Sequence, residues 1–459
     1  MNMLDQQNID EESLHLAKIG SNFLGILNDI KRRPEDAARE LQIPIEQIQS
    51  IIQGKLAPSS EIIERASSVW PVNEKDFYVP KDDCSTGVKI FRVDESKKSA
   101  RIMTRAGKPY YEYRDTAMSC VAPFRPEWIM ELCFVDNNNP ENVDVQWNNG
   151  HFMHQFTYFI GEVNFYYKND NGSKEVEIMN TGDSMYITPF VPHSFATRKG
   201  AKENGLILAL TYGNKLTGDV QDELSSLNTN LGSEFTMDFT NTMSASASLL
   251  KYFMESASIS IEELSKTSSI SENNLIKFTN AELMPSNQEL SLLAKALRIN
   301  VRDLIPNDKI ENKVVIQHYE KARKWNFPLS TTAYEFIELA STTALPFSKA
   351  FEINVRSIDN SELDLRVGLH QFIYNIGETN IILNWEIENE KIQTTIYPGD
   401  SLYIKPFIKH NFRGDGKLLV LRIGGKIAGE AQRELSILGK DNVKRAISET
   451  TQWFDPSGK

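Results

Sequence analysis

The chain has 459 residues, and at about 100–200 residues per domain this length predicts roughly two to four domains and excludes a small disulfide-stapled scaffold. Hydrophobic residues make up 40% and charged residues 24% of the chain, a balance that excludes intrinsic disorder. The net charge of −12 opposes binding to a phosphate backbone, so a nucleic-acid role would need a local basic patch.

The cysteines and the apolar runs indicate where the chain resides. Cys84, Cys120 and Cys133 form no C-x-x-C pair and leave one over, which argues against a disulfide framework and a cysteine zinc site. The N-terminus is polar and acidic, and apolar runs such as the one in residues 204–213 are too short for a membrane span. We therefore expect a soluble cytoplasmic protein with no membrane partner.

Two long motifs occur twice in the chain. Residues 155–162 read QFTYFIGE and residues 371–378 read QFIYNIGE. Residues 182–195 read GDSMYITPFVPHSF and residues 399–412 read GDSLYIKPFIKHNF. Two ordered matches of this length are far beyond chance, so the second half is a diverged copy of the first.

Each copy begins with a helical segment and continues into strands. Residues 21–54 and 247–299 space their apolar residues at helical intervals, which predicts helix-turn-helix-like bundles. The later runs are rich in β-branched and aromatic residues. We predict an α+β, mainly β fold in which a helical module and a cupin (double-stranded β-helix) barrel alternate. The predicted domains are a helical module at 11–75, a catalytic barrel at 80–235, a second helical module at 243–307, a degenerate barrel at 310–425 and a tail at 426–459.

The repeated GDS-x-Y-I-x-PF-x-x-H motif indicates how a histidine reaches the barrel interior. Gly-Asp favours a tight turn, a short strand follows, and Pro189 or Pro406 bends the chain at an edge. The histidine, His193 or His410, then comes next in the chain. This pattern is typical of the second motif of a cupin.

The first copy holds a candidate metal site. On a strand, residues four apart share a face, so His151 and Gln155 converge, and His193 arrives from a later strand. Two imidazoles and an amide oxygen make a facial set for Fe(II), although zinc or manganese would also accept them. Ile187 stands where a cupin carboxylate ligand is expected, so the amide replaces the acid. His154 is an odd step from His151 and is expected to face outward.

A single histidine is more often a satisfied core residue than a ligand, and the repeat changes this balance. The second copy retains Gln371 and His410 but has Val367 where the first has His151. Three further polar residues are replaced with it: Pro328 stands for Arg105, Phe336 for Tyr113 and Asp364 for Asn148. These losses predict one active barrel and one vestigial barrel.

The same replacements suggest the kind of ligand. Arg105 offers a planar donor fork, Tyr113 a hydroxyl and Asn148 an amide, a set that suits a multivalent oxyanion such as a phosphonate. Arg105 and Tyr113 are an even strand interval apart, although Gly107 and Pro109 interrupt the strand. An exposed arginine and a packed tyrosine remain the alternative.

The helical modules raise the possibility of a ligand-sensing transcription regulator. Base readout requires a recognition helix with basic and polar residues, yet residues 44–54 contain no basic residue and residues 271–282 contain only Lys277. We therefore expect no nucleic-acid partner. A basic run, Lys31-Arg32-Arg33, lies at a helix end, and its expected counterpart, Met254-Glu255-Ser256, lacks it. This run is either a solvated face or an anion-binding group.

The segments NNGHFMHQF, RAGKPYYEY and GDSMYITPFVPH together resemble a family of tandem-cupin non-haem iron oxygenases, the 2-hydroxyethylphosphonate dioxygenases and methylphosphonate synthases. The resemblance covers nearly the whole chain. In the first branch the third iron ligand is a glutamate at the position of Ile187. The chain departs there and so resembles the methylphosphonate synthases, whose ligands match His151, Gln155 and His193.

This resemblance implies an activity. It implies Fe(II)- and O2-dependent cleavage of the carbon–carbon bond of 2-hydroxyethylphosphonate, without 2-oxoglutarate, to methylphosphonate and bicarbonate. It also implies substrate binding by Lys31, Arg105, Tyr113 and Asn148, with catalytic roles for Tyr113 and His193. Helical modules of this kind suit a homo-oligomer, a dimer or tetramer. Arg32 competes with Lys31, and the contact can come from a neighbouring subunit. The alternatives are a dioxygenase giving hydroxymethylphosphonate and formate, a helix-turn-helix cupin regulator, and a cupin isomerase or epimerase that needs no oxygen.

Overall fold

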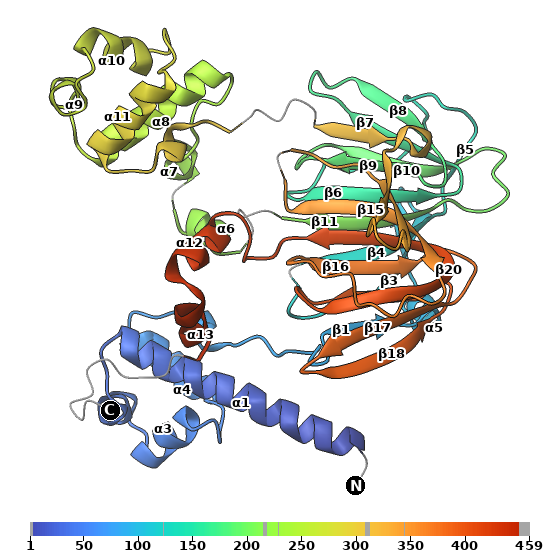
Figure 1. The fold of residues 1–459 in the computed structure, drawn as a ribbon, viewed down its shortest axis with the longest axis horizontal. Helices are drawn as coiled ribbons and strands as arrows, with labels where there is room; N and C mark the ends of the chain where they lie inside the picture. The colour runs from blue at the N-terminus through green and yellow to red at the C-terminus, as the bar shows by residue number, and fades with distance from the viewer. Residues whose placement is uncertain are drawn as a thin grey trace.

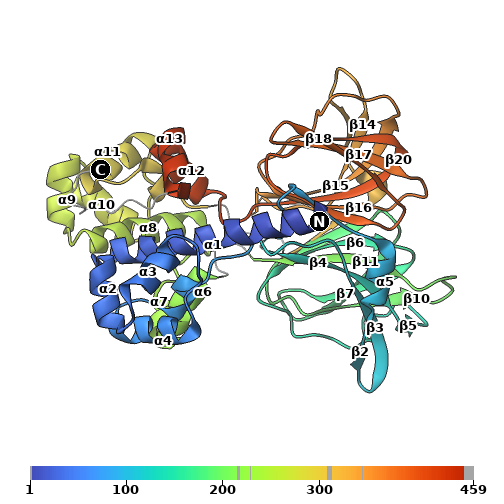
Figure 2. The same ribbon diagram turned by 90° about the horizontal axis from the view of Figure 1, so that it is seen from below.

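The computed structural model describes residues 3–122, 124–213, 218–227, 229–307, 313–343 and 345–448. Two helical bundles lie on one side of the molecule and two β-barrels lie together on the other (Figures 1 and 2). Bundle and barrel alternate along the chain, as the repeat predicts. Within these residues, no helix combines the length and the apolar character that a membrane crossing requires.

The two bundles share one connection geometry. The first contains α1 (Met3–Asp29), α2 (Pro34–Leu41), α3 (Ile45–Ile52) and α4 (Ser60–Val69), followed by the 3-10 helix η1 (Glu74–Phe77). The second contains α8 (Thr242–Ser256), α9 (Ile261–Ser268), α10 (Glu272–Thr279) and α11 (Asn287–Leu297), followed by η2 (Val301–Leu304). Each bundle encloses its own apolar cluster, because its helices present their apolar faces to one another.

The turn after the first helix of each bundle corrects the predicted pairing of the basic run. Lys31 has a φ of 59° and its N–H bonds to the carbonyl of Asn28; Ser258 has a φ of 51° and bonds in the same way to Glu255. The counterpart of Lys31 is therefore Ser258, not Met254. The basic run still has no basic counterpart, because Ser258 is followed by Ile259 and Ser260.

Two sheets form the first barrel. In one the strands lie in the order β12-β9-β6-β11-β4-β3-β2, and in the other β5-β10-β7-β8. Their bounds are β2 (Arg101–Arg105), β3 (Lys108–Asp115), β4 (Arg125–Glu131), β5 (Phe134–Val135), β6 (His154–Ile160), β7 (Val163–Lys168), β8 (Lys174–Met179), β9 (Ser184–Ile187), β10 (His193–Arg198), β11 (Leu206–Tyr212) and β12 (Val314–Gln317).

The second barrel repeats this arrangement. Its sheet has the order β1-β19-β16-β20-β15-β14-β13, and β17 and β18 pair beside β20. The bounds are β1 (Val88–Phe91), β13 (Lys324–Phe327), β14 (Tyr334–Glu338), β15 (Ser348–Ser357), β16 (His370–Asn375), β17 (Ile381–Ile387), β18 (Glu390–Ile396), β19 (Ser401–Ile404) and β20 (Lys409–Ile423). The single strand β20 corresponds to β10 and β11 of the first barrel.

The two barrels exchange strands. β1 precedes the first barrel in sequence but pairs with β19 of the second, and β12 precedes the second barrel but pairs with β9 of the first. The predicted ranges 80–235 and 310–425 cut across this exchange. Each exchanged strand covers an edge whose N–H and C=O groups would otherwise be unpaired, so the exchange ties the barrels into one unit.

A shared apolar cluster lies between the barrels. It joins Phe156 and Leu208 of the first barrel to Phe372 and Leu421 of the second. Separate clusters fill the two barrel interiors. Buried Glu352 crosses the contact, since its carboxylate accepts a hydrogen bond from the Tyr158 hydroxyl (2.7 Å).

The bundle side of the molecule also holds the helices α6 (Asp219–Ser226), α7 (Thr229–Glu234), α12 (Glu430–Leu438) and α13 (Lys440–Ser448) (Figures 1 and 2). Lys75 of η1 pairs with Asp222 of α6 (2.7 Å), and Arg302 of η2 pairs with Glu430 of α12. The predicted tail at 426–459 thus contains α12 and α13, and its last residues, 449–459, lie outside the described residues.

Candidate metal and substrate site

His151 and Gln155 meet at the mouth of the first barrel. Nε2 of His151 lies 2.9 Å from Oε1 of Gln155. The four-residue spacing predicted that His151 lies on a strand. It does not, because β6 begins at His154. A loop places it instead: the Phe190 N–H donates to the His151 carbonyl (2.8 Å), and Gly150, with a φ of 76°, lets the two backbones approach closely.

His193 completes the set from the first residue of β10. The ring centroids of His151 and His193 lie 5.2 Å apart. In both rings Nδ1 lies beside a backbone carbonyl, that of Met153 (2.8 Å) for His151 and that of Val191 (2.9 Å) for His193. A proton on each Nδ1 leaves the Nε2 lone pairs for a metal ion. Burial lowers the pKa of His193 to about 4, which keeps this ring neutral, as a ligand must be.

These donors fit a metal ion only if the amide takes part. Among the described residues, no group of three or more His, Cys, Asp and Glu side chains is placed to hold a metal ion. Ile187, fully buried, lies directly opposite Gln155 in the pairing of β6 with β9, so the position expected for a carboxylate is apolar. The amide oxygen of Gln155 is the group placed to serve as a third donor beside the two imidazoles, and such a set would suit Fe(II).

Asn148 is held so that its amide points at His193. Its Oδ1 accepts from the N–H groups of Gly150 (2.9 Å) and His193 (2.8 Å). Its Nδ2 then lies 3.1 Å from Nε2 of His193. Asn148 thus lies beside the candidate metal position, with its amide nitrogen directed at His193.

Arg105 and Tyr113 approach from the β2–β3 hairpin. Arg105 Nη1 donates to the Gln146 carbonyl (2.7 Å), and its guanidinium lies 4.7 Å from the ring centroid of Tyr111. The Tyr113 ring lies 6.0 Å from that of Tyr111. Burial, together with the charge of Glu131, raises the pKa of Tyr113 to about 12, so its hydroxyl stays protonated and can donate. The two residues are on adjacent strands, not on one continuous strand.

Lys31 is not brought to this site within one chain. It follows the end of α1, and its Nζ donates to the carbonyl of Asn28 in its own turn (2.9 Å). The bundle of α1, α3 and α4 lies apart from β6 and β10 (Figure 1). The competing Arg32 is held by Glu40, whose Oε2 lies 3.2 Å from Arg32 Nε.

The second barrel fills the equivalent position with an arginine. Gln371 and His410 remain, but Arg422 Nε donates to Gln371 Oε1 (3.2 Å), and the guanidinium lies 5.6 Å from the ring centroid of Phe336. The strand pairings show that its counterpart in the first barrel is Thr211, since Arg422 pairs with Gln371 as Thr211 pairs with Gln155. Sequence reasoning missed Arg422, although a comparison of this position in the two copies would have revealed it.

His154 and its counterpart His370 have structural contacts. Nδ1 of His154 bonds to the Tyr186 hydroxyl, and Nδ1 of His370 bonds to the Tyr403 hydroxyl (2.6 Å). Each imidazole is stacked on the tyrosine ring that it contacts. Both copies retain the pair, so it serves the contact between the barrels and not the metal site.

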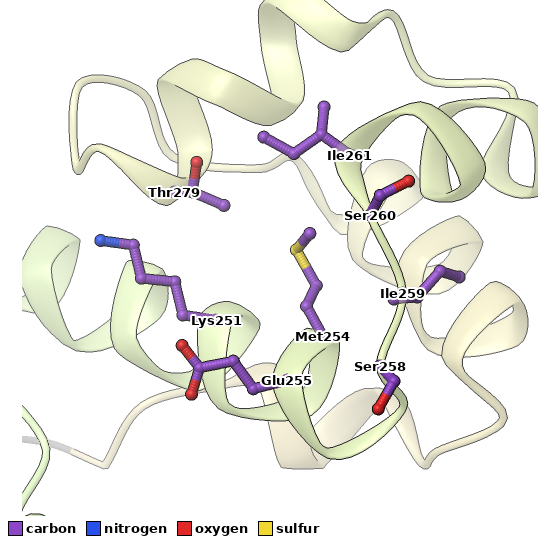
Figure 3. Close-up of a pocket in the computed structure, with 8 residues that line it drawn as sticks. All are labelled: Lys251, Met254, Glu255, Ser258, Ile259, Ser260, Ile261 and Thr279. Atoms are coloured by element: carbon purple, nitrogen blue, oxygen red, sulfur yellow. The ribbon is translucent and has the colours of Figure 1, made fainter.

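A separate cavity of about 450 Å³ lies in the second bundle (Figure 3). Its charged lining residues are Lys251 and Glu255, and the segment 258–261 closes one side. Its lining includes no histidine or cysteine, and the second bundle lies on the other side of the molecule from β6 and β10 (Figure 1). It lies between α8, the segment 258–261 and the end of α10, and has no part in the site.

The sequence is 61% identical over 444 residues to a methylphosphonate synthase of Nitrosopumilus maritimus (strain SCM1), covering 97% of each chain. The chain belongs to the methylphosphonate synthase family. This confirms the family predicted from the motifs of the first copy. It also decides between the two branches, in agreement with an amide at Gln155 and an apolar residue at Ile187.

Structural comparison agrees with this membership of the methylphosphonate synthase family. The fold matches the HEPD of Streptomyces albus, solved with 2-hydroxyethylphosphonate and Fe(II) bound, with a TM-score of 0.88 and 34% identity over 96% of this chain and 99% of that one. PhpD, solved with cadmium and hydroethylphosphonate, has the same fold, with a TM-score of 0.74 and 17% identity over 94% and 99%. Residues 250–306 match the Cro/C1-type HTH DNA-binding domain. The predicted tandem fold is confirmed.

Proposed function

We propose that the first barrel binds Fe(II) through His151, Gln155 and His193 and converts 2-hydroxyethylphosphonate and O2 to methylphosphonate and bicarbonate. The observation that carries this proposal is the convergence of Nε2 of His151 and Oε1 of Gln155 beside the ring of His193. Bound Fe(II) supplies the activation of dioxygen that breaks the carbon–carbon bond. The HEPD of Streptomyces albus, which binds this phosphonate and Fe(II), supports both assignments.

The phosphonate is bound by Arg105, Tyr113 and Asn148. Arg105 supplies a positive charge and a donor fork, and the protonated Tyr113 hydroxyl donates to a phosphonate oxygen. Asn148 donates from Nδ2 next to His193, where it orients an oxygen of the substrate. Tyr113 and His193 are the catalytic residues of the proposal, because one touches the substrate and the other the metal ion.

Lys31 joins this site from a second copy of the chain. Within one chain the helical bundle holds Lys31 away from β6 and β10, so a contact with substrate requires a neighbouring subunit (Figure 1). We infer a homo-oligomer, a dimer or tetramer, on this ground. A mixture of Lys31→Ala chains with His151→Ala chains tests it, because sites that combine an intact barrel with an intact Lys31 would regain turnover.

We infer no nucleic-acid partner, despite the Cro/C1-type match. α3 has no basic residue, and α10 has only Lys277. A helix without positive charge gains little from phosphate contacts. A cytoplasmic location is also inferred, supported by three cysteines that are all free.

The deciding experiment is phosphorus NMR of the products. The chain is loaded with Fe(II) without oxygen, 2-hydroxyethylphosphonate is added, and oxygen is then admitted. Methylphosphonate is the expected product, and hydroxymethylphosphonate would show that Gln155 does not set the outcome. Unchanged substrate in the presence of bound Fe(II) would overturn the proposed substrate.

A further inference from the structure

Glu131, at the end of β4, is a carboxyl group buried inside the first barrel. It is fully buried, and neither carboxylate oxygen has a hydrogen-bond partner among the described residues. Burial raises the pKa of Glu131 well above its ordinary range, and the charge of Arg105 acts in the opposite direction. An unpartnered buried carboxyl destabilises a fold, so its presence requires a reason.

Glu131 lies beside residues of the proposed phosphonate site. Glu131 lies opposite Tyr111 in the pairing of β3 with β4, and paired residues share a face of the sheet. Arg105 stacks on the ring of Tyr111 and Tyr113 contacts the same ring, so these residues form one cluster around the tyrosine. Arg105 forms no ion pair with another carboxylate in the described part of the chain.

The second barrel shows that the fold does not need this carboxyl. Tyr113 pairs with Ile129 in the first barrel, and its counterpart Phe336 pairs with Ile353 in the second. Two residues further along, Glu131 therefore corresponds to Val355, which is fully buried. The carboxyl is absent from the barrel that also lacks Arg105, Tyr113 and His151.

We propose that Glu131 is a positioning residue that orients Arg105 and Tyr113 for the phosphonate from inside the barrel. Its buried carboxyl is the acidic group on the Tyr111 side of the sheet, next to the ring on which Arg105 stacks and which Tyr113 contacts. Preorganised donors bind an anion without the cost of ordering them. This inference rests on the proposed site, since it acts through Arg105.

Two substitutions separate positioning from a structural role. Glu131→Val introduces the residue of the second barrel, and Glu131→Gln keeps the shape but replaces the acid with an amide. We expect Glu131→Val to raise Tm, since a buried unpartnered carboxyl is lost, and to lower kcat/KM at least tenfold, mainly through KM for 2-hydroxyethylphosphonate. Glu131→Gln lowers kcat/KM in the same sense, and Fe(II) affinity stays within twofold in both variants.

The matched control is Glu352→Gln, another buried carboxyl, which has partners in Tyr158 and Lys417. It should lower Tm and leave KM unchanged. A kcat/KM within twofold of the original in both Glu131 variants would overturn the proposal, as would a fall in activity that only parallels a fall in Tm.

A double substitution tests whether Glu131 acts through Arg105. Arg105→Lys alone should raise KM. In that background, adding Glu131→Gln should lower kcat/KM by less than a further threefold. A full additional loss in the double variant contradicts a role through Arg105. If Arg105→Lys leaves KM unchanged while Glu131→Gln raises it, Arg105 does not bind the phosphonate. The proposed phosphonate site is then wrong, and the fault does not lie with the role of Glu131 alone.

Discussion

Arg422 donates a hydrogen bond from Nε to Oε1 of Gln371 (3.2 Å), and so places a guanidinium beside the amide whose counterpart, Gln155, faces the candidate metal ion in the first barrel. The guanidinium also lies 5.2 Å from the ring centroid of Phe351. The second barrel therefore carries a side-chain cation at the position that corresponds to the candidate metal position of the first. Its apolar interior and this arginine make it a structural partner of the first barrel.

The first prediction concerns the metal ligands of the two barrels. His151→Ala should abolish Fe(II) binding and turnover, because only one imidazole and one amide then remain. Metal analysis after anaerobic loading and phosphorus NMR measure the two effects. His410→Ala is the matched control in the second barrel. It should keep the iron content of the native chain, about one Fe(II) per chain. Retained iron in His151→Ala would contradict the ligand set.

The second prediction restores a metal site to the second barrel. Val367→His supplies the missing imidazole, and Arg422→Thr removes the cation and introduces the residue found at Thr211. Together they should raise the bound metal from about one to about two ions per chain, since His410 and Gln371 already remain. Each single variant is a control and should stay at the lower value. An unchanged metal content in the double variant would show that the vestigial barrel has lost the geometry.

The third prediction tests the tyrosine hydroxyl. Tyr113→Phe introduces the residue of the second barrel, Phe336. Loss of a hydrogen bond to a charged group costs about 1.5–3 kcal/mol, so kcat/KM should fall roughly 10- to 100-fold, chiefly through KM. Steady-state oxygen consumption at varied phosphonate concentration gives both constants. Phe336→Tyr, the reverse change in the second barrel, should leave them unaltered.

The fourth prediction concerns the loop that places His151. A Cβ at Gly150, which has a φ of 76°, would lie 2.6 Å from the backbone of Phe190. Gly150→Ala should therefore displace His151 and weaken Fe(II) binding at least tenfold, with a loss of more than about 1 kcal/mol in stability. Gly172→Ala is the control, because it has a similar φ of 82° but nothing within 4 Å of the added Cβ. Equal iron affinity in both variants would contradict the role of this close approach.

The fifth prediction concerns stability in acid. Burial raises the pKa of Asp83, but hydrogen bonds from Lys89, Ser119 and Cys120 outweigh it and lower the pKa to about 2. A depressed carboxyl pKa stabilises the folded state above the unfolded pKa of about 4, here by about 1 kcal/mol because solvent screens a partly exposed group, and the contribution disappears as the pH falls toward 2.

Asp83→Asn should therefore lower Tm at pH 7, and the difference from the native chain should shrink below pH 4. Calorimetric melting at several pH values measures it. Asp170→Asn, which breaks an exposed pair with Lys313, is the control and should change Tm little at any pH. A Tm difference for Asp83→Asn that is constant from pH 7 to below pH 4 would rule out this linkage.

The repeat and its local motifs could be read directly from the sequence. Matching segments around Gln155 and Gln371, and around His193 and His410, predict two barrels with one shared plan, because strand and turn preferences are local. The residues that differ between the copies point to His151, Arg105 and Tyr113 as the functional set of the first barrel. The tandem fold and the family followed from these observations, and both are confirmed.

Other features depend on contacts between distant segments, which no local pattern encodes. The exchange of β1 and β12 between the barrels depends on which sheet edges are free to pair. The position of His151 depends on the close approach of Gly150 to Phe190. Helix α1 ends away from the barrels, and Lys31 follows that end in the chain (Figure 1). The burial of Glu131 and the reach of Arg422 likewise arise only when the sheets close, because burial and reach are properties of the assembled barrel.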